Sequence, residues 1–474
     1  MTYSDSKFDL VIIGGGAAAF SAAIKAEVYG VKTAMIEKHV LGGTCVNVGC
    51  IPSKNLLGVG EILHSSKNPV YPAISPCTEA FDFTRVIRDK DNLVRFLRSS
   101  KYNDVLSGFE NVRLIEGEAY FVSDKVVTVN ARRIESDKFI IATGSSPIVP
   151  AIKGIEAVDY ITNVEALSLK EKPSSMIIIG GRALGLEFAQ MYSRFGTKVT
   201  LLQRNDRIIP DHEPEISEML HKYLVDEGIE IFTGVKIVEA YQNNGTKFVK
   251  SALGATGNEQ IFEGEQLLIA TGRKPNTLDL HLENIGVRLR ENDGAIIVNS
   301  EMRTSASNIW GAGDVLGAPM LESAAAKEGS IAAENALTGT HKRIDFLSVP
   351  SAIFTSPQVA SVGLTESQMI QRFGYCSSKT LEMNQVPKAL TVNQTKGLIK
   401  MVVNPKQNNT IVGVHILADL AADIIHEAVL AVKYRLTTDD IVDTVHVFPT
   451  MTEAIKLVAT SFKQDIRKLT CCAE

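Results

Sequence analysis

Two cysteines near the start of the chain, Cys45 and Cys50, have four residues between them and can close a small disulfide ring. Pro52 suits the first turn of a helix, so the pair lies at a predicted helix start. The positive end of that helix, together with Lys54, favours a thiolate, and we expect a lowered pKa and a redox nucleophile. The alternatives are a structural disulfide, which cytosolic chains rarely keep, or two inert core thiols.

Composition restricts the classes of partner. The 474 residues suffice for two to four domains, and 45% of them are hydrophobic. A net charge of -5 gives no basic footprint for nucleic acid or for an anionic membrane. The start of the chain lacks the features of a secretory signal, and no apolar run approaches the roughly 18 residues of a membrane span. We therefore expect a cytoplasmic protein without membrane or nucleic-acid partners.

A glycine-rich turn lies between an apolar, β-branched run at residues 8–13 and a helical pattern at residues 20–29. Gly14 permits the tight turn, and Gly16 lets backbone amides approach a pyrophosphate at the helix N-terminus. A second predicted strand, residues 31–37, places Glu37 where it can hold a ribose hydroxyl. Strand, turn, helix and acidic residue together predict a dinucleotide site.

The same plan recurs at residues 176–202, where a strand is followed by the turn from Gly180 to Gly185, a helix and a second strand at residues 198–202. Gln203 stands at the interval that Glu37 has in the first unit, and Arg204 and Arg207 follow it. Because a carboxylate repels a 2′-phosphate and arginine binds it, this exchange favours NADPH over NADH. Solvated surface arginines are the alternative interpretation.

The segment from residue 42 to residue 54, with both glycine turns, resembles the FAD-dependent pyridine nucleotide-disulfide oxidoreductases, and matching landmarks cover nearly the whole chain. The resemblance implies an α/β fold with two Rossmann-like nucleotide-binding domains and an α+β dimerisation domain, as in glutathione reductase. The expected FAD domain comprises residues 1–150 and 271–345, the NADPH domain residues 151–270, and the interface domain residues 346–474. From residue 349 the sequence predicts an antiparallel sheet, followed by helices at residues 421–434 and 451–469. A homodimer whose active site is shared between the chains is implied.

The resemblance also assigns ligands for the two cofactors, FAD and NADPH. The cofactor-binding residues that it implies are Gly14, Gly16, Ala18, Ala19, Glu37, Gly43, Thr44, Lys54, Ala119, Thr143, Gly144, Gly180, Gly185, Glu187, Arg204, Arg207, Gly272, Arg273 and Asp314. Arg182 departs from the family pattern, because it occupies the second glycine position of the second turn. Ala183 departs too, since many relatives have a bulky residue there.

The disulfide-reducing members carry a His-x-His-Pro-Thr sequence near the C-terminus, in which a glutamate orients a histidine that protonates the leaving thiolate. Here Phe448 replaces that histidine, and Glu453 matches the glutamate. Thiol-disulfide exchange benefits from a general acid, so Phe448 argues against a disulfide substrate. We expect a structural role for His446, two residues earlier.

The chain ends with the adjacent Cys471 and Cys472, whose sulfurs suit a soft cation better than a strained disulfide ring. This tail resembles that of the mercury-reducing members. The resemblance implies that Cys471 and Cys472 of the partner subunit take Hg(II) from small thiols and pass it to Cys45 and Cys50 for reduction. The catalytic residues would be Cys45, Cys50, Lys54 and Glu453, and the metal ligands would be Cys45, Cys50, Cys471 and Cys472.

One further expectation and two alternative functions complete this interpretation. The chain begins directly at the FAD domain, so first capture of the metal falls to the tail or to another protein. One alternative function is a disulfide reductase similar to dihydrolipoamide dehydrogenase, which Phe448 disfavours. The other is a non-enzymatic protein that sequesters soft metals, which leaves two nucleotide sites unexplained.

Overall fold

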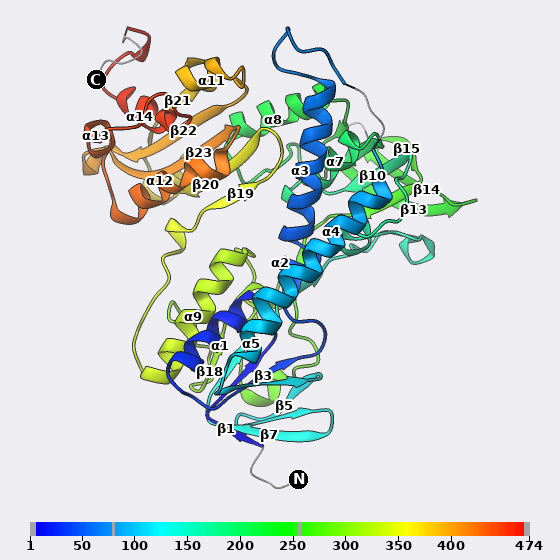
Figure 1. Cartoon of the computed structure of the whole chain (residues 1–474), viewed down its shortest axis with the longest axis vertical. Helices are drawn as coiled ribbons and strands as arrows, with labels where there is room; N and C mark the ends of the chain where they lie inside the picture. Colours follow the sequence, from blue (N-terminus) through cyan, green and yellow to red (C-terminus); the bar gives the residue numbers. More distant parts are fainter. Residues whose placement is uncertain (1–5, 78–80, 255–256, 469–474) are drawn as a thin grey trace. The chain divides into compact units, whose positions relative to one another are not determined.

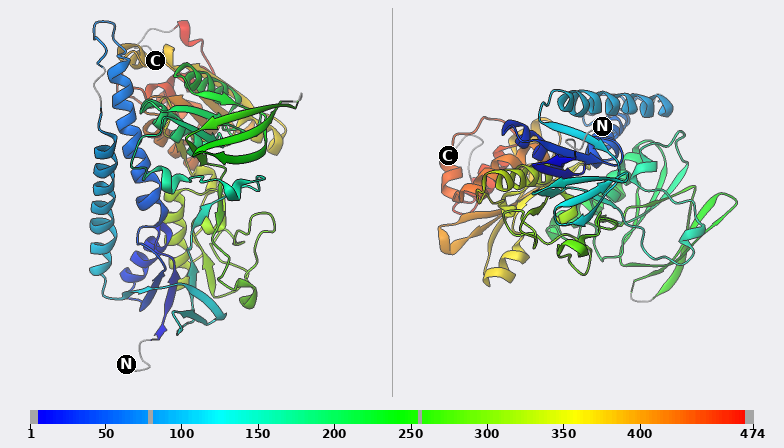
Figure 2. Two further views of the ribbon diagram at one scale, coloured as in Figure 1. Left: turned by 90° about the vertical axis from the view of Figure 1, so that its right-hand side faces the viewer. Right: turned by 90° about the horizontal axis from the view of Figure 1, so that it is seen from below.

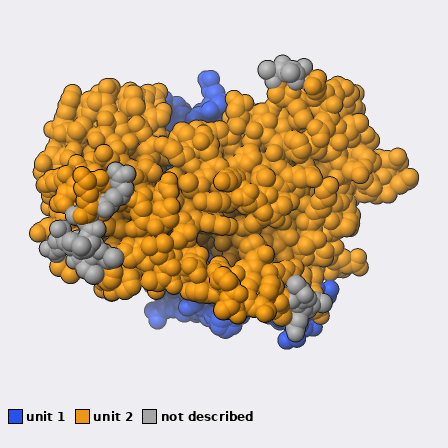
Figure 3. Space-filling model, turned by 90° about the horizontal axis from the view of Figure 1, so that it is seen from above, with its two compact units in different colours: residues 1–53, 84–148, 272–344 blue, residues 54–83, 149–271, 345–474 orange. Residues whose placement is uncertain are grey.

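The computed structural model describes residues 6–77, 81–254 and 257–468. Its internal contacts divide the chain into two units, coloured separately in Figure 3. Unit 1 comprises residues 1–53, 84–148 and 272–344, and unit 2 comprises residues 54–83, 149–271 and 345–474. The three domain ranges inferred from the sequence stay a prediction.

Unit 1 is built on a five-stranded parallel sheet in the order β18-β8-β2-β3-β4. Its strands are short apolar runs, as expected where both faces of a parallel sheet are covered. Helices α1 (Ala17–Val28) and α9 (Glu322–Thr338) lie side by side on it (Figure 1). The strands are β2 (Leu10–Ile13), β3 (Thr33–Glu37), β4 (Val112–Glu116), β8 (Phe139–Ile141) and β18 (Ile309–Gly311).

The other parts of unit 1 flank this sheet. A four-stranded sheet contains β1 (Lys7–Phe8), β5 (Ala119–Ser123), β6 (Val126–Val129) and β7 (Arg132–Ser136), and shares an apolar core with it. The helices that lie mostly in unit 1 are α2 (Gly43–Val48), α4 (Phe83–Arg98) and α5 (Asp104–Ser107), with a π-helical turn at Ser99–Asn103. Helix α3 (Cys50–Lys67) begins in unit 1 and continues into unit 2. The helix start predicted at Cys50 is confirmed.

Unit 2 contains a second parallel sheet, in the order β12-β11-β10-β16. The strand predicted at residues 198–202 is confirmed as β11. A ribbon of three long antiparallel strands extends this part of the unit (green in Figure 2). The elements are α6 (Asn163–Ala166), β10 (Ser175–Ile179), α7 (Ala183–Arg194), β11 (Lys198–Leu202), α8 (Pro214–Asp226), β12 (Glu230–Phe232), β13 (Val235–Asn243), β14 (Thr246–Leu253), β15 (Asn258–Gly264) and β16 (Gln266–Ile269).

The C-terminal part of unit 2 is a five-stranded antiparallel sheet, as predicted, in the order β19-β20-β23-β22-β21. Its elements are β19 (Ser351–Ile353), β20 (Gln358–Gly363), α10 (Glu366–Phe373), β21 (Ser377–Glu382), α11 (Pro387–Thr391), β22 (Leu398–Asn404), β23 (Thr410–Ala418), α12 (Ala421–Tyr434), α13 (Thr438–Asp443) and α14 (Glu453–Thr460). Across the described ranges, no helix combines the length and the apolar character needed to cross a membrane.

One predicted helix is wrong in extent. The sequence suggested a continuous helix from Met451 to Leu469, whereas α14 ends at Thr460. The side chains of Thr460 and Ser461 donate hydrogen bonds to carbonyl oxygens of the preceding turn. Such local bonds compete with continuation of a helix.

A buried ion cluster joins α8 to the C-terminal sheet inside unit 2. Lys400 on β22 lies 3.0 Å from Glu213, 2.9 Å from Glu215 and 2.7 Å from Glu366. The side chains of Lys400 and Glu213 are only 3% and 2% exposed. The charges of Lys400 and Glu213 are therefore compensated by protein partners rather than by water.

We expect Lys400→Met to lower the apparent free energy of unfolding by about 3–5 kcal/mol, because Glu213 would remain buried without its counter-ion. Urea denaturation followed by circular dichroism measures this. Lys153→Met is the matched control, since Lys153 pairs with Glu239 at 3.0 Å but is 76% exposed. The control should change stability by less than about 1 kcal/mol. Equal losses in the two variants would contradict the expectation.

Candidate functional site

The first glycine turn follows β2 and brings two backbone segments into close contact. Gly14 has φ +125°, and a Cβ built on it would lie 2.2 Å from the carbonyl oxygen of Ala142. A Cβ on Gly43 would lie 2.7 Å from the Cα of Gly16. Gly16 is the N-cap of α1, so free amides face a space kept clear of side chains. This cradle fits a pyrophosphate.

The acidic residue of the motif lies at the same turn. Glu37 ends β3, and a Cβ on Gly15 would lie 2.8 Å from its Oε2 atom. Its Oε1 atom accepts a hydrogen bond from the backbone of His39 at 2.7 Å. The carboxylate is therefore held over the glycine turn, where the sequence predicts a ribose hydroxyl. Ala18 and Ala19 are buried in α1.

A polar cluster at the end of β18 unites residues from four distant segments of unit 1. Ser145 donates to Asp314 at 2.6 Å, and Arg273 donates to Ser145 at 2.7 Å and to Thr44 at 3.3 Å. Burial lowers the pKa of Arg273, and the charge of Asp314 opposes that shift. Three of these residues are predicted cofactor ligands, and Ser145 was missed.

Neighbouring predicted residues stabilise the same edge. The Thr143 hydroxyl donates to the carbonyl oxygen of Asn276 at 2.7 Å, and the Asn276 amide donates back to Thr143 at 2.9 Å. Gly144 and Gly272 both have positive φ angles, and Ala119 is buried at the start of β5. The predicted FAD residues of unit 1 therefore cluster at the carboxyl edge of the main sheet.

Glu328 on α9 was also missed by sequence reasoning. It is 3% exposed, and its carboxylate accepts a hydrogen bond from the backbone N–H of Gly313 at 2.7 Å. Burial raises the pKa of Glu328 to about 7, and the neighbouring charge of Asp314 acts in the same direction. Glu328 thus anchors the peptide that precedes Asp314.

The two thiols lie on consecutive helices, Cys45 on α2 and Cys50 at the first position of α3. A hydrogen bond with Cys50 raises the pKa of Cys45, and burial and the charge of Glu322 add to it. The thiol of Cys45 therefore holds its proton in the dithiol form, because it donates that proton to the Cys50 sulfur. The lowered pKa expected for a thiolate at the helix start stays a prediction. Tyr102 lies nearby, and its pKa is raised to about 12 by burial and by Cys45.

The second glycine turn, in unit 2, repeats the geometry of the first. Gly180 has φ +119°, and a Cβ on it would lie 2.3 Å from the carbonyl oxygen of Ala270. A Cβ on Gly185 would lie 1.8 Å from the carbonyl oxygen of Gly180. Only glycine fits these two positions, so α7 packs closely against the turn and its N-terminus is available to an anion.

Arg182 and Gln203 show how this turn differs from the family pattern. Arg182, at the second glycine position, forms an ion pair with Asp211. Burial lowers the pKa of Arg182, and the adjacent charge of Arg204 lowers it further. Gln203 is buried and accepts a hydrogen bond from the backbone N–H of Gly181 at 3.0 Å. Arg204 is exposed, and Arg207 donates to the carbonyl oxygen of Pro210 at 3.0 Å.

Lys54 and Glu187, both in unit 2, form an ion pair. The Lys54 Nζ atom lies 2.7 Å from Glu187 Oε2, and Glu187 is buried on α7. The sequence placed both residues near a cofactor, and the structure pairs them directly.

The predicted C-terminal site is only partly described. His446 contacts Glu427 at 2.8 Å and the Thr444 carbonyl at 2.9 Å, which fits the structural role expected of it. Glu453 begins α14, and within the described part of the chain its buried Oε2 atom has no hydrogen-bond partner. Burial raises the pKa of Glu453. Cys471 and Cys472 lie outside the described residues.

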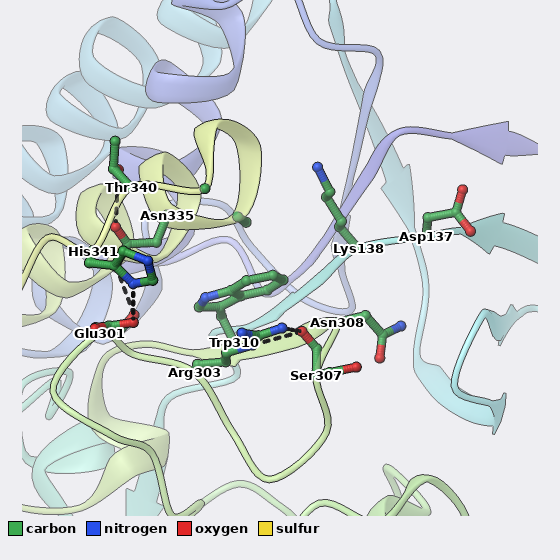
Figure 4. Close-up of a pocket in the computed structure, with 12 residues that line it drawn as sticks. Asp137, Lys138, Glu301, Arg303, Ser307, Asn308, Trp310, Asn335, Thr340 and His341 are labelled. Atoms are coloured by element: carbon green, nitrogen blue, oxygen red, sulfur yellow. Dashed lines mark hydrogen bonds and ion pairs between the residues drawn. The ribbon is translucent and has the colours of Figure 1, made fainter.

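A separate pocket of about 300 Å³ lies at the opposite edge of the main sheet of unit 1 (Figure 4). Lys138 and Asn308 precede β8 and β18, whereas the glycine turns follow the strands. Within its lining, Glu301 contacts His341 at 2.9 Å, and Arg303 donates a hydrogen bond to the Ser307 carbonyl. The pocket is therefore distinct from the predicted cofactor site.

This fold and these sites are those of a flavin- and pyridine-nucleotide-dependent oxidoreductase. Residues 8–329 match the pyridine nucleotide-disulphide oxidoreductase family, and residues 349–459 match its dimerisation domain. The chain belongs to this family. Membership implies use of a flavin and a pyridine nucleotide, and the dimerisation domain indicates a homodimer.

Relatives and solved structures agree with this assignment. The chain is 42% identical to a mercuric reductase of Staphylococcus aureus, covering 99% of this chain and 85% of that one. It is 38% identical to a mercuric reductase of Streptomyces lividans, with both chains fully covered. The HOCl-induced flavoprotein disulfide reductase RclA of Escherichia coli aligns with a TM-score of 0.85 at 29% identity, covering 96% of this chain and 100% of that one.

Glu328→Gln should stabilise the protein at pH 8. A carboxyl that titrates near 4.5 when unfolded and at about 7 when folded destabilises the fold as pH rises through that window. The upper limit of the gain is ~3 kcal/mol, and it should vanish toward pH 4.5. Thermal unfolding between pH 4.5 and 8 measures it. Glu334→Gln on the same helix is the control, because its carboxylate pairs with Lys25 and Lys342 and should bring no gain.

Proposed function

We propose that this protein reduces thiol-bound Hg(II) to elemental mercury, with FAD as its flavin and NADPH as its electron donor. The observation that carries the proposal is the Cys45–Cys50 thiol pair, in a chain that aligns with mercuric reductases over 99% of its length. Two adjacent thiolates are ligands that a soft cation prefers. We place the reaction in the cytoplasm, where thiols are kept reduced.

The cofactor identities rest on the two glycine turns. In unit 1, Glu37 lies at the first glycine turn, where it suits the ribose hydroxyls of FAD. Asp314 belongs to the polar cluster with Ser145 and Arg273 and suits the ribityl hydroxyls. In unit 2, the carboxylate is replaced by Gln203, and the exposed Arg204 is available to a 2′-phosphate. This second arrangement favours NADPH.

The thiols bind the metal and hold it for reduction. When bound, the nicotinamide and the flavin supply two electrons, so that NADPH and Hg(II) give NADP⁺, a proton and Hg(0). Cys45 and Cys50 must each be thiolates to hold Hg(II), so metal binding releases their protons. Because the pKa of Cys45 is raised in the dithiol form, its thiol must lose a proton when the metal binds.

The interface domain is proposed to complete the site. Val445, Val447 and Phe448 are 85%, 77% and 45% exposed in the single chain, as expected of apolar residues that a dimer buries. Cys471 and Cys472 of the partner subunit would then transfer Hg(II) to Cys45 and Cys50. Phe448 supplies no proton, and release of a neutral metal atom requires none.

The decisive assay follows NADPH oxidation by the purified protein at excess small thiol, with Hg(II) or with oxidised lipoamide. We expect mercury-dependent turnover and volatile mercury.

Cys45→Ala should lower turnover at least about 100-fold, because it removes a metal ligand. Replacing both Cys471 and Cys472 by Ala should slow turnover of Hg(II)-thiol complexes. Cys77→Ala, which removes an exposed thiol, is the control. Turnover of lipoamide alone would instead identify a disulfide reductase.

Arg204→Gln should lower kcat/KM for NADPH about 10- to 100-fold, the loss expected for one charge-assisted bond to phosphate, while leaving NADH little changed. Steady-state kinetics with both nucleotides measures the ratio. Arg132→Gln, an exposed arginine on β7 of unit 1, is the matched control. A parallel loss with both nucleotides would show that Arg204 does not read the 2′-phosphate.

A further inference from the structure

The segment between β19 and β20 is fixed to α7 inside unit 2 by three hydrogen bonds between its main chain and side chains of the helix. The backbone N–H of Phe354 donates to Glu187 Oε1 at 2.9 Å. The side-chain amide of Gln190 accepts from the Ser356 N–H at 2.8 Å and donates to the Ser356 carbonyl at 2.8 Å. Glu187 and Gln190 are three residues apart on α7, so they share one face of the helix.

This segment also contacts Lys54. The Lys54 Nζ atom lies 4.6 Å from the centre of the Phe354 ring, which is cation–π distance. The same ammonium lies 2.7 Å from Glu187 Oε2. Both carboxylate oxygens of Glu187 are therefore used, one by Lys54 and the other by the backbone of Phe354.

Gln190 makes further contacts that hold its own side chain in place. It is fully buried, and its Nε2 atom also lies 3.1 Å from Glu227 Oε2. Glu227 in turn accepts from Arg194 Nε at 3.0 Å, and Arg194 is 5% exposed. The polar face of α7, formed by Glu187, Gln190 and Arg194, therefore has a defined partner at each position.

We propose that Phe354 and Gln190 are positioning residues for Lys54, holding its ammonium in one orientation through the Phe354 ring and the main chain of residues 354–356. Lys54 lies one helical turn after Cys50 in α3, and its side chain remains 33% exposed. Without the ring, the ammonium keeps its ion pair with Glu187 and gains rotational freedom. The inference rests on the proposed function only in placing a flavin near Lys54.

The first test needs neither flavin nor mercury. Lys54 is acylated with a limiting amine-reactive reagent, and its modification rate is measured by peptide mass spectrometry. Phe354→Leu should raise that rate at least about threefold, the change expected on losing a partly exposed cation–π contact. Phe354→Tyr keeps a ring and should restore the rate of the natural protein. Gln190→Met should raise the rate by releasing the segment, and an unchanged rate in Phe354→Leu would overturn the inference.

Tyr375→Leu is the matched control, because Lys406 lies 4.1 Å from the Tyr375 ring elsewhere in the same unit. It should leave Lys54 unchanged and expose Lys406 instead. Equal acceleration at Lys54 in this control would reveal general loosening and overturn the inference.

The second test is the midpoint potential of the bound flavin. A tenfold weaker stabilisation of the reduced form equals about 30 mV, and we expect Phe354→Leu to lower the potential by this order, with recovery in Phe354→Tyr. An unshifted potential would overturn the positioning role even if mercury turnover is intact. Conversely, a natural protein without mercury-dependent turnover overturns the proposed function, while the labelling result still decides the role of Phe354.

Discussion

The structure depends on a close contact that occurs in both glycine turns. In each turn, the glycine that follows a parallel strand lies against a carbonyl oxygen at the end of the neighbouring strand. The built Cβ of Gly14 meets Ala142 at 2.2 Å, and that of Gly180 meets Ala270 at 2.3 Å. No other residue fits without moving the sheet. Because the chain turns so tightly there, the next helix starts at the sheet edge and presents its amides to a phosphate group. The two predicted nucleotide sites follow from this shared constraint.

Beyond the turns, the sites are shaped by polar side chains that are themselves held in place. Glu328 holds the peptide before Asp314, Ser145 bridges Asp314 and Arg273, and Glu187 takes Lys54 on one oxygen and a backbone N–H on the other. A buried polar group with a full set of partners has few alternative orientations. The pre-organisation needed for electron transfer thus lies in these supporting contacts as much as in the predicted ligands.

Sequence reasoning succeeded where a local pattern dictates the structure. The strand at residues 198–202 and the helix at Ala421–Tyr434 have the predicted bounds, because alternation and helical periodicity are local. It missed the partnership of Ser145 with Asp314, 169 residues away, and that of Gln190 with Ser356, 166 residues away. The raised pKa of Cys45 was also missed, because it depends on a hydrogen bond from its thiol to the Cys50 sulfur, which lies on the next helix. Side-chain contacts made only on folding leave no short-range signal.

Whether a disulfide or a metal suits this site better depends on whether the reaction needs a proton donor. A disulfide substrate leaves behind a thiolate that needs a proton, and the position that would supply it holds Phe448. The nearby His446 is bound to Glu427 and to the Thr444 carbonyl, so its ring would have to give up both contacts to act as an acid. Metal reduction needs no such proton donor, because the thiols lose their protons when they bind the metal and the product leaves as a neutral atom. A site with two neighbouring thiols and no general acid at position 448 is therefore better matched to Hg(II) than to a disulfide.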